Sequence, residues 1–230
     1  IARECLSKGE GGQELVEALF RYAFKRIDDN YRKYESVGEN LAEQIPPDGT
    51  ILTQCFGETI IGTLLNACRR RKNDIHVICA ETRPYFQGAR LTASVVCDMG
   101  FDVTVITDNM AGCTMKTKQV DVFTSAADVI TMDGHVINKV GTFQLALLAD
   151  YHKIPYYVTG SPNPAHPDAA SVVIEERDPE LALRALDVKV TKEGVKGYYP
   201  AFDITPPELV SGVVTSKGIY GPHDLKRFYE

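Results

Sequence analysis

The sequence predicts an α/β fold in which a doubly wound, mainly parallel sheet carries helices on both faces and a small helical region precedes it. Two observations predict this fold. Short apolar runs rich in β-branched residues alternate with segments of helical periodicity, and a longer amphipathic pattern comes before them. The chain has 230 residues, of which 44% are hydrophobic, and this suffices for one main core with an appendage.

The N-terminal region has the periodicity of helices. From Gly12 to about Gln44, apolar residues recur at helical spacing between charged ones, which predicts one long or two shorter amphipathic helices. The stretch IPPDG at 45–49 ends the pattern, because two prolines and a glycine do not continue a helix. We therefore expect an N-terminal helical region at 1–46 and a Rossmann-like catalytic domain at 47–230.

The second region alternates between strand and helix patterns. Such alternation predicts parallel strands with helices on both faces, and ligands of these sheets bind beyond the carboxyl ends of the strands. Residues that directly follow each apolar run are therefore the candidates for a site. The apolar runs cover 50–53, 76–80, 103–107, 120–125, 128–131 and 155–159, and the helical segments cover 58–70, 87–99 and 142–150.

Charge argues against a nucleic-acid partner. The net charge is −6, whereas binding to phosphate backbones depends on clustered Lys and Arg. The one dense basic run, Arg69 to Lys72, falls where a helix should end, and cations there complement the helix dipole. No apolar run reaches the roughly 18 to 20 residues of a membrane span, and no basic leader is visible. A cytoplasmic protein without a membrane partner is expected.

The sequence gives no sign of a metal or a nucleotide cofactor. Six cysteines show no CxxC pair and no His-linked spacing of the kind that binds zinc. Neither GxGxxG nor GxxxxGK[ST] is present, so a dinucleotide site and a P-loop have no support. We expect no metal and no cofactor, and a small molecule as ligand.

Two residues at strand ends are candidates for acid and base chemistry. Cys55 follows the first apolar run and directly precedes a helix, whose N-terminus would stabilise a thiolate. A lone cysteine in such a place is more often a packed small residue. Asp128 lies in an apolar run, where burial of an unpaired carboxylate would raise its pKa. A carboxyl group of this kind suits general acid catalysis.

Two further stretches carry groups that bind sugars and phosphates. The loop at 80–90 holds Arg83, Gln87 and Arg90 beside Glu81, which indicates either a polar pocket or a structural Glu–Arg network. After it, Asp108 has the position of a helix N-cap. Further along, Asn138, Lys139, Gly141 and Thr142 lead into a helix and offer an anion backbone N–H groups, a cation and a hydroxyl.

Eight blocks in order resemble one family. The similarity is to the methylthioribose-1-phosphate isomerases, which share a broader family with ribose-1,5-bisphosphate isomerases and the regulatory subunits of a translation-initiation guanine-nucleotide-exchange factor. It covers about 51–218. The blocks are ILTQC, ETRPYFQGARLTA, TDNMAG, SAADVI, NKVGTFQLALLA, IPYYV, IEER and PAFDITPPELVSGVVTSKG.

The resemblance implies roles for five residues. The catalytic cysteine falls on Cys55, the catalytic aspartate on Asp128, and the glutamine that contacts a substrate hydroxyl on Gln87. The substrate-contacting pair falls on Asn138 and Lys139. The implied activity is aldose–ketose isomerisation of a 5-substituted ribose 1-phosphate in methionine salvage, without metal or nicotinamide, by a homodimer.

The chain departs from the family pattern in three places. Phe56 replaces a polar Asn after the cysteine, and Ala126-Ala127 replaces the start of a GAD motif. The upstream Arg-Gly-Ala segment and the Arg-Pro stretch that help to hold the phosphate have no counterpart before Leu52. Either the chain is truncated, or a partner subunit or different residues supply that contact.

The implied chemistry starts with an acid. An aldose 1-phosphate has its anomeric oxygen blocked, so ring opening needs protonation of the ring oxygen, which we assign to Asp128. Cys55 would then take a proton from C2, or a hydride would pass directly from C2 to C1. Rival interpretations are a regulatory subunit that binds a sugar phosphate or nucleotide as a signal, and a plain Rossmann-like binding domain.

The substrate group at C5 and the subunit interface are also open to prediction. Phe56, Tyr85 and Phe86, with Glu58 adding negative charge, favour an apolar C5 group over a second phosphate. The apolar segments 143–148 and 154–157 are candidates for a dimer interface, with ordinary core as the other interpretation.

Overall fold

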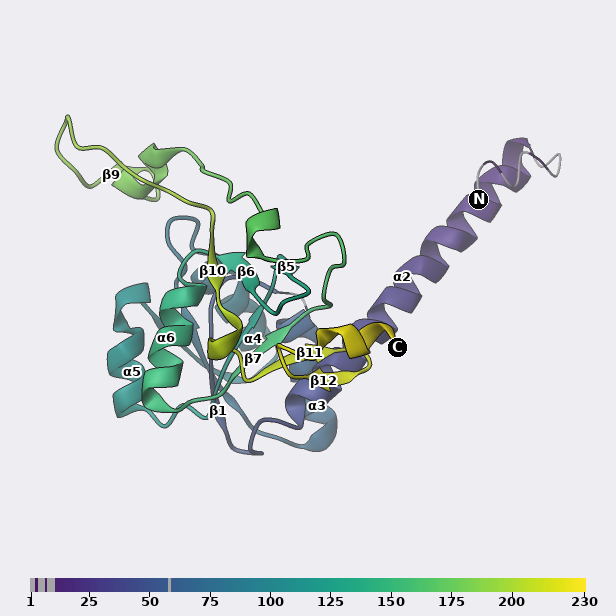
Figure 1. The fold of residues 1–230 in the computed structure, drawn as a ribbon, viewed down its shortest axis with the longest axis horizontal. Coiled ribbons are helices and arrows are strands. Elements are labelled where there is room, and N and C mark those ends of the chain that lie inside the picture. The colour runs from purple at the N-terminus through teal and green to yellow at the C-terminus, as the bar shows by residue number, and fades with distance from the viewer. Residues whose placement is uncertain (1–2, 4–6, 8–10, 58) are drawn as a thin grey trace.

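A seven-stranded sheet forms the centre of the computed structural model, which describes residues 3, 7, 11–57 and 59–230 (Figure 1). Its strands are β1 (Thr50–Thr53), β2 (His76–Ala80), β3 (Asp102–Ile106), β4 (Val122–Ala126), β7 (Tyr156–Thr159), β11 (Gly212–Thr215) and β12 (Gly218–Tyr220). Their order is β12-β11-β7-β4-β1-β2-β3, and all neighbours are parallel except β12 with β11. This order confirms the predicted doubly wound sheet.

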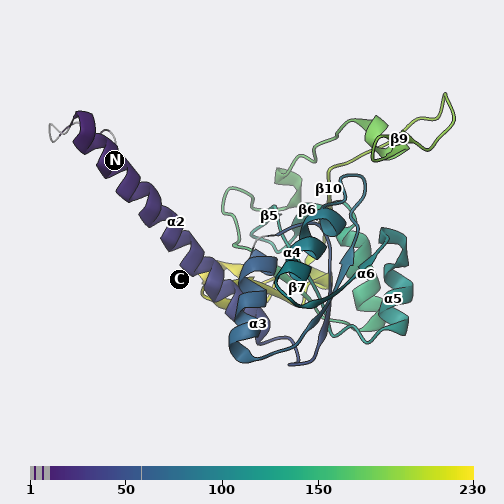
Figure 2. The ribbon, with the colours of Figure 1, turned by 180° about the vertical axis from the view of Figure 1, so that it is seen from behind.

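Helices cover both faces of this sheet (Figures 1 and 2). The helices on one face are α2 (Gly12–Ala42), α3 (Leu65–Arg71) and α4 (Ala93–Asp98), and those on the other are α5 (Ala111–Thr117) and α6 (Thr142–His152). Two π-helical turns, η1 (Thr59–Leu64) and η2 (Gly88–Thr92), lead into α3 and α4. Short 3-10 turns lie at Asp108–Met110, Ala169–Ser171, Pro179–Leu183, Pro207–Leu209 and Leu225–Tyr229.

Successive residues of the central strands fill two different cores. In β1, Ile51 packs beneath α2 and α3, whereas Leu52 packs beneath α5 and α6. Val77 and Ile78 of β2 divide in the same way. Because side chains alternate across a strand, a strand covered on both faces must be apolar at every position. This is why the sequence shows unbroken apolar runs here.

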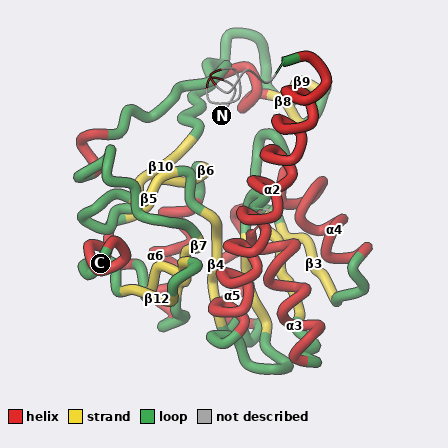
Figure 3. The backbone as a smooth tube through the Cα atoms, turned by 90° about the vertical axis from the view of Figure 1, so that its right-hand side faces the viewer, coloured by secondary structure: helices red, strands yellow, loops and turns green. Residues whose placement is uncertain are grey.

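A second, antiparallel sheet stands at the carboxyl ends of the main strands (Figure 3). It consists of β5 (Val129–Ile130), β6 (Val136–Lys139) and β10 (Phe202–Thr205), in the order β10-β6-β5. The prediction of a further parallel strand at 128–131 was wrong, since β5 belongs to this small sheet. Only two residues separate β5 from β4, whereas a parallel connection needs about a dozen or more. A hairpin of β8 (Arg184–Ala185) and β9 (Val188–Lys189) lies further out.

The predicted N-terminal helix is a single long one, and its N-terminal part extends away from the rest of the molecule (Figure 1). Only its C-terminal turns are buried, through Val37, Gly38, Leu41 and Ala42. The division of the chain at residue 46 stays a prediction. Within the described residues, none of the helices is both long and apolar enough to cross a membrane.

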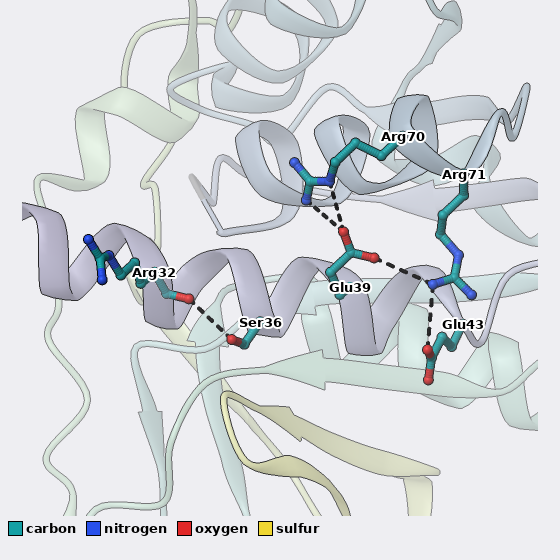
Figure 4. A network of polar contacts seen from close by, with 6 residues as sticks. All are labelled: Arg32, Ser36, Glu39, Glu43, Arg70 and Arg71. Carbon is teal, nitrogen blue, oxygen red and sulfur yellow. Dashed lines mark hydrogen bonds and ion pairs between the residues drawn. The ribbon is translucent and has the colours of Figure 1, made fainter.

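Ion pairs fasten α2 to α3 (Figure 4). The Glu39 carboxylate lies 2.7 Å from Arg70 and 3.4 Å from Arg71, and Arg71 also meets Glu43 at 3.5 Å. The hydrogen bond from Arg70 lowers the pKa of Glu39. The basic run that was predicted to end a helix does so, and two of its arginines bind the neighbouring helix.

The contact between α2 and η1 leads to a stability prediction. A Cβ atom added to Gly38 would meet the backbone carbon of Thr63 at 2.5 Å, whereas one added to Gly62 of the facing turn would meet nothing within 4 Å. We expect Gly38→Ala to lower the free energy of unfolding by about 2 kcal/mol or more through overpacking. Gly62→Ala should be neutral or stabilising by up to about 1 kcal/mol. Urea unfolding measures both, and equal effects would contradict this packing.

Candidate active site

The residues predicted for catalysis follow two neighbouring parallel strands, at the same edge of the sheet. β1 lies between β2 and β4, so chain progression reverses there, which is where doubly wound sheets bind ligands. Cys55 lies two residues beyond β1 and Asp128 two residues beyond β4. The pKa of the Cys55 thiol is raised chiefly by burial, and the Asp128 carboxylate adds a smaller increase.

Two threonines hold the Cys55 backbone in a left-handed conformation. Its φ is 59°, which is uncommon for a non-glycine residue. Its N–H donates to Thr82 Oγ1 at 2.7 Å, and its carbonyl accepts from Thr92 Oγ1 at 2.5 Å. Both threonines come from the segment after β2. The hydrogen bonds therefore hold the Cys55 backbone in this conformation, and this uncommon backbone conformation lies at the residue predicted to be catalytic.

The protonation of Cys55 differs from the expectation. Burial raises the pKa of the thiol, and this exceeds the lowering by the Phe56 backbone N–H, Lys139 and Arg177. The prediction that the following helix start would favour the thiolate was therefore wrong in its net effect, because the side chain is partly buried. Glu58, which was expected to add negative charge here, lies outside the described residues.

Asp128 stands at the rim of a cavity of about 360 Å³. The expected burial in an apolar run was wrong, since the residue is exposed. Surrounding protein atoms still displace part of the carboxyl group's hydration and raise its pKa, against the lowering by Arg177 and Lys139. The other residues that line the cavity are Lys33, Tyr34, Val37, Ala126, Ala127, Thr159, Gly160, Ser161 and Ser216.

Lys139 is a buried cation at the end of β6. The residue is only 2% exposed, its Nζ donates to the Tyr199 hydroxyl, and it lies 4.5 Å from the Tyr199 ring centroid and 5.4 Å from that of Tyr85. Burial lowers its pKa, and the charge on Cys55 opposes this. Asn138 beside it is 4% exposed and donates to Thr142 Oγ1 at 3.0 Å. The predicted Asn–Lys pair thus lies in the wall of the site.

The N-terminus of α6 is already occupied by a carboxylate. Asp203 of β10 accepts the Gly141 N–H at 2.6 Å and the Phe143 N–H at 3.2 Å. These N–H groups were expected to bind a ligand anion, and that expectation was wrong. Burial raises the pKa of Asp203 to about 6. No local pattern pointed to this contact, since Asp203 reaches the helix only through the pairing of β10 with β6.

Some residues of the polar loop after β2 have structural roles, and others are candidates for ligand binding. Asp108 accepts the N–H groups of Thr82 and Arg83 at 2.8 and 2.7 Å, so it shapes this loop and is not an N-cap, a position that Thr107 holds. The Arg83 guanidinium donates to the carbonyl of Arg184 at 2.6 Å, so the Arg83 side chain binds the projecting β8–β9 hairpin.

The remaining residues of that loop differ in their surroundings. Arg90 is exposed. No ion pair joins Glu81 to either arginine within the part of the chain that the structure describes, so the alternative of a Glu–Arg network is not realised there. Gln87 has a buried Oε1 without a hydrogen-bond partner among the described residues. Such an acceptor is unusual in a folded protein and is available to a ligand hydroxyl.

Arg177 is a further charged residue of the site that the sequence analysis did not select. It lies between β7 and β10, and its charge lowers the pKa of both Cys55 and Asp128. Arg177 is the last residue of the block IEER, so the resemblance included this residue but assigned it no function. Among the described residues, no group of three or more Cys, His, Asp or Glu side chains lies close enough together to hold a metal ion.

The fold and site together define an α/β protein with a cysteine, a carboxyl group and two cations at the switch point of its sheet. Residues 2–222 match the Initiation factor 2 subunit family. The chain belongs to that family.

Its relatives include named enzymes. The methylthioribose-1-phosphate isomerase of Chloroflexus aurantiacus is 39% identical over 223 residues, covering 93% of this chain and 64% of that protein. The isomerase of the same name from Fervidobacterium nodosum is 38% identical, covering 94% and 65%. The chain thus spans somewhat less than two thirds of the length of these curated relatives.

Solved structures agree with the fold. A 5-methylthioribose 1-phosphate isomerase from Pyrococcus horikoshii OT3 matches with a TM-score of 0.90 and 28% identity, covering 99% of this chain and 67% of that one. The translation initiation factor eIF-2B, subunit delta, from A. fulgidus matches with a TM-score of 0.88 and 33% identity, covering 96% and 67%. Both kinds of protein therefore share this architecture.

The partly buried Asp203 carboxyl group, which binds the start of α6, predicts a pH dependence of stability. Because the pKa of Asp203 rises from 3.8 to about 6 on folding, the folded state holds its proton more tightly than the unfolded chain. The resulting stabilisation is complete below pH 3.8 and is lost as the pH rises through about 6. The stabilisation lost between these two pH values is about 3 kcal/mol.

Unfolding free energies from pH 4 to 8 test this. The wild type should lose more stability across the range than Asp203→Asn does, by up to about 3 kcal/mol. Asp187→Asn, on the exposed hairpin, is the matched control and should follow the wild type. Parallel curves for wild type and Asp203→Asn would refute the assignment.

Proposed function

We propose that this protein is an aldose–ketose isomerase that converts a 5-substituted ribose 1-phosphate, 5-methylthioribose 1-phosphate or 5-deoxyribose 1-phosphate, to the ribulose 1-phosphate. The observation that carries the proposal is that Cys55 and Asp128 follow the paired strands β1 and β4 at the switch point, with the charges of Lys139 and Arg177 acting on both. The relatives named methylthioribose-1-phosphate isomerase support it. The reaction would belong to methionine salvage.

The electrostatics of the site suit an acid-assisted ring opening. The raised pKa of Asp128 keeps a larger fraction of its carboxyl group protonated, so it can donate to the ring oxygen. In one route Cys55 then removes the C2 proton and a proton is returned to C1. In the alternative route a hydride passes from C2 to C1 while the pair moves only oxygen-bound protons. In both routes the C2 hydroxyl loses its proton as the ketone forms. The two cations stabilise negative charge on Cys55 and on the developing enolate in the first route.

Three further residues would hold the sugar. The unpartnered Gln87 Oε1 can accept a hydrogen bond from a substrate hydroxyl. Lys139 supplies a cation inside the wall, and Asn138 stands beside it at the end of β6. Arg83 is engaged by the hairpin and Arg90 is exposed, so we assign the substrate-binding role mainly to Gln87, Asn138 and Lys139.

A regulatory subunit is the second candidate. The match to eIF-2B subunit delta favours it, because that protein has the same fold at 33% identity. A ribose-1,5-bisphosphate isomerase is the third. Turnover of pentose 1-phosphates separates an enzyme from a subunit that only binds a ligand, and comparison of substrates separates the two isomerases.

The catalytic pair is tested by conservative substitutions. Cys55→Ser and Asp128→Asn should each lower turnover by about 10² to 10⁴, the usual effect of removing a general acid or base, while the fold persists. Cys113→Ser replaces an exposed cysteine outside the site and serves as the control. A coupled assay in which either variant turned over like the wild type would remove that residue from the mechanism.

The C5 group is tested by substrate preference. The cavity beside Asp128 has Val37, Ala126 and Ala127 in its walls, with Lys33 as a cation at one side. A second phosphate would need several cations or free N–H groups. We expect kcat/KM for 5-methylthioribose 1-phosphate or 5-deoxyribose 1-phosphate to exceed that for ribose 1,5-bisphosphate by about tenfold or more. A preference for the bisphosphate would reverse the assignment.

We also propose a cytoplasmic homodimer. On α6, Phe143, Leu147 and Tyr151 are exposed at four-residue spacing and form one apolar stripe, which supports an interface there. The other predicted segment, 154–157, runs into β7, where Tyr156 is core, so we no longer place it in the interface. Sedimentation velocity at micromolar concentration should give about twice 25.4 kDa, and a single species at monomer mass would exclude the dimer.

A further inference from the structure

Between the end of β7 at residue 159 and the start of β10 of the small antiparallel sheet at residue 202, the chain makes a long excursion away from the main sheet (Figure 1). Part of this excursion is firmly anchored. The backbone N–H of Arg177 donates to the Tyr199 carbonyl at 2.9 Å, and the backbone N–H of Ala201 donates to the Glu175 carbonyl at 2.8 Å. Between them, Glu176 and Pro200 form an antiparallel bridge. Arg177 therefore stands on a fixed backbone platform.

The Arg177 side chain is held on several sides. Its Nε and Nη2 bind the two carboxylate oxygens of Glu175 at 3.0 and 3.2 Å. Its guanidinium carbon lies 5.7 Å from the ring centroid of Tyr85 and 5.5 Å from that of Phe202, which are cation–π distances. The carboxylate and the two rings come from three different segments, so the position of this cation is set by the tertiary fold.

Lys139 and Arg177 share one aromatic ring. Lys139 Nζ lies 5.4 Å from the Tyr85 centroid and Arg177 lies 5.7 Å from it. The charge of Arg177 contributes to the lowered pKa of Lys139, which is the sign of repulsion between like charges. Both cations also act on Cys55 and Asp128. An anion bound beside both would relieve this repulsion at the place where the chemistry is proposed.

Other predicted anion binders are engaged elsewhere. The N–H groups at the start of α6 bind Asp203, and the Arg83 guanidinium binds the Arg184 carbonyl. Lys139 and Arg177 are cations whose charge acts on both Cys55 and Asp128, so a phosphate bound beside these residues would meet both of them.

We propose that Arg177 is a substrate-binding residue that, together with Lys139, binds the phosphate of a sugar phosphate. A guanidinium presents a planar fork of donors that fits phosphate oxygens. Glu175 occupies two of the five N–H groups of Arg177, and the Tyr199 side chain also hydrogen-bonds this guanidinium. The proposal rests on the proposed function, because it names the residue that would hold the phosphate of that substrate.

Kinetics of three variants test the proposal. Arg177→Met removes the charge and keeps much of the side-chain length, and it should raise KM for the sugar 1-phosphate by about 10 to 100-fold, because a phosphate contact made equally in ground and transition states is uniform binding. Any fall in kcat, from the lost charge beside Cys55, should be smaller than the rise in KM. Arg177→Lys keeps the charge but loses the planar set of donors, so its KM should lie between those of the wild type and Arg177→Met. Lys189→Met removes a charge from the same excursion, where Lys189 pairs with Glu193 on the hairpin, and should behave like wild type.

A second readout does not depend on turnover. Alkylation of Cys55 by iodoacetamide, followed by peptide mass spectrometry across pH, should show its midpoint shifted upward in Arg177→Met, because a cation that favours the thiolate is gone. Inorganic phosphate should slow this alkylation in the wild type, and at least about tenfold more phosphate should be needed in Arg177→Met.

The outcomes separate the two proposals. A wild type that turns over no pentose 1-phosphate yet is protected by phosphate through Arg177 would refute the isomerase and keep this binding role. An Arg177→Met variant with wild-type KM and wild-type phosphate protection would overturn the role of Arg177, and so would equal effects in Lys189→Met. If Arg177→Met fails to fold by circular dichroism, the Arg177→Lys variant decides, and unchanged KM and protection in that folded variant would likewise overturn it.

Discussion

The parallel pairing of β1 with β4 is the constraint on which the site depends. Thr53 lies opposite Thr124, so the chain emerges from both strands at one edge of the sheet, and Cys55 and Asp128 follow within a few residues. Because β1 also pairs with β2, the loop after β2 reaches Cys55, and Thr82 and Thr92 bind its backbone. A one-residue slip would turn the apolar side chains of β1 to the wrong cores, so core packing protects the register of the site.

The pairing of the small antiparallel sheet is a second constraint on the site. The pairing of β10 with β6 sets Asp203 opposite Asn138 and Phe202 opposite Lys139. From there the Asp203 carboxylate reaches the start of α6, and the Phe202 ring supports Arg177. The small antiparallel sheet thus joins the helix, the buried lysine and the excursion between β7 and β10 into one wall.

Local patterns predicted the main elements of the fold, and the resemblance supplied the candidate site residues, whose roles stay predictions. The run Thr50–Thr53 is a strand as expected, and strand ends indicated where Cys55 would lie. Asp203 and Arg177 escaped prediction for a physical reason: Asp203 contacts Gly141 from 62 residues away, and no periodicity encodes such a pairing. The exposure of Asp128 was missed because an apolar run cannot reveal that the chain turns out of the sheet within it.

The same electrostatics bear on the order of proton transfers. In the free site, burial and crowding raise the pKa of both Cys55 and Asp128, while Lys139 and Arg177 oppose the rise. A phosphate bound by the two cations would neutralise part of that opposition and raise both pKa values further. Asp128 would then be more fully protonated when substrate is present, as ring opening requires, whereas a thiolate on Cys55 would become harder to form. Substrate binding would therefore leave more of the Asp128 carboxyl protonated and less of the Cys55 thiol ionised, and the smaller thiolate population would weigh against removal of the C2 proton by Cys55 relative to the hydride route.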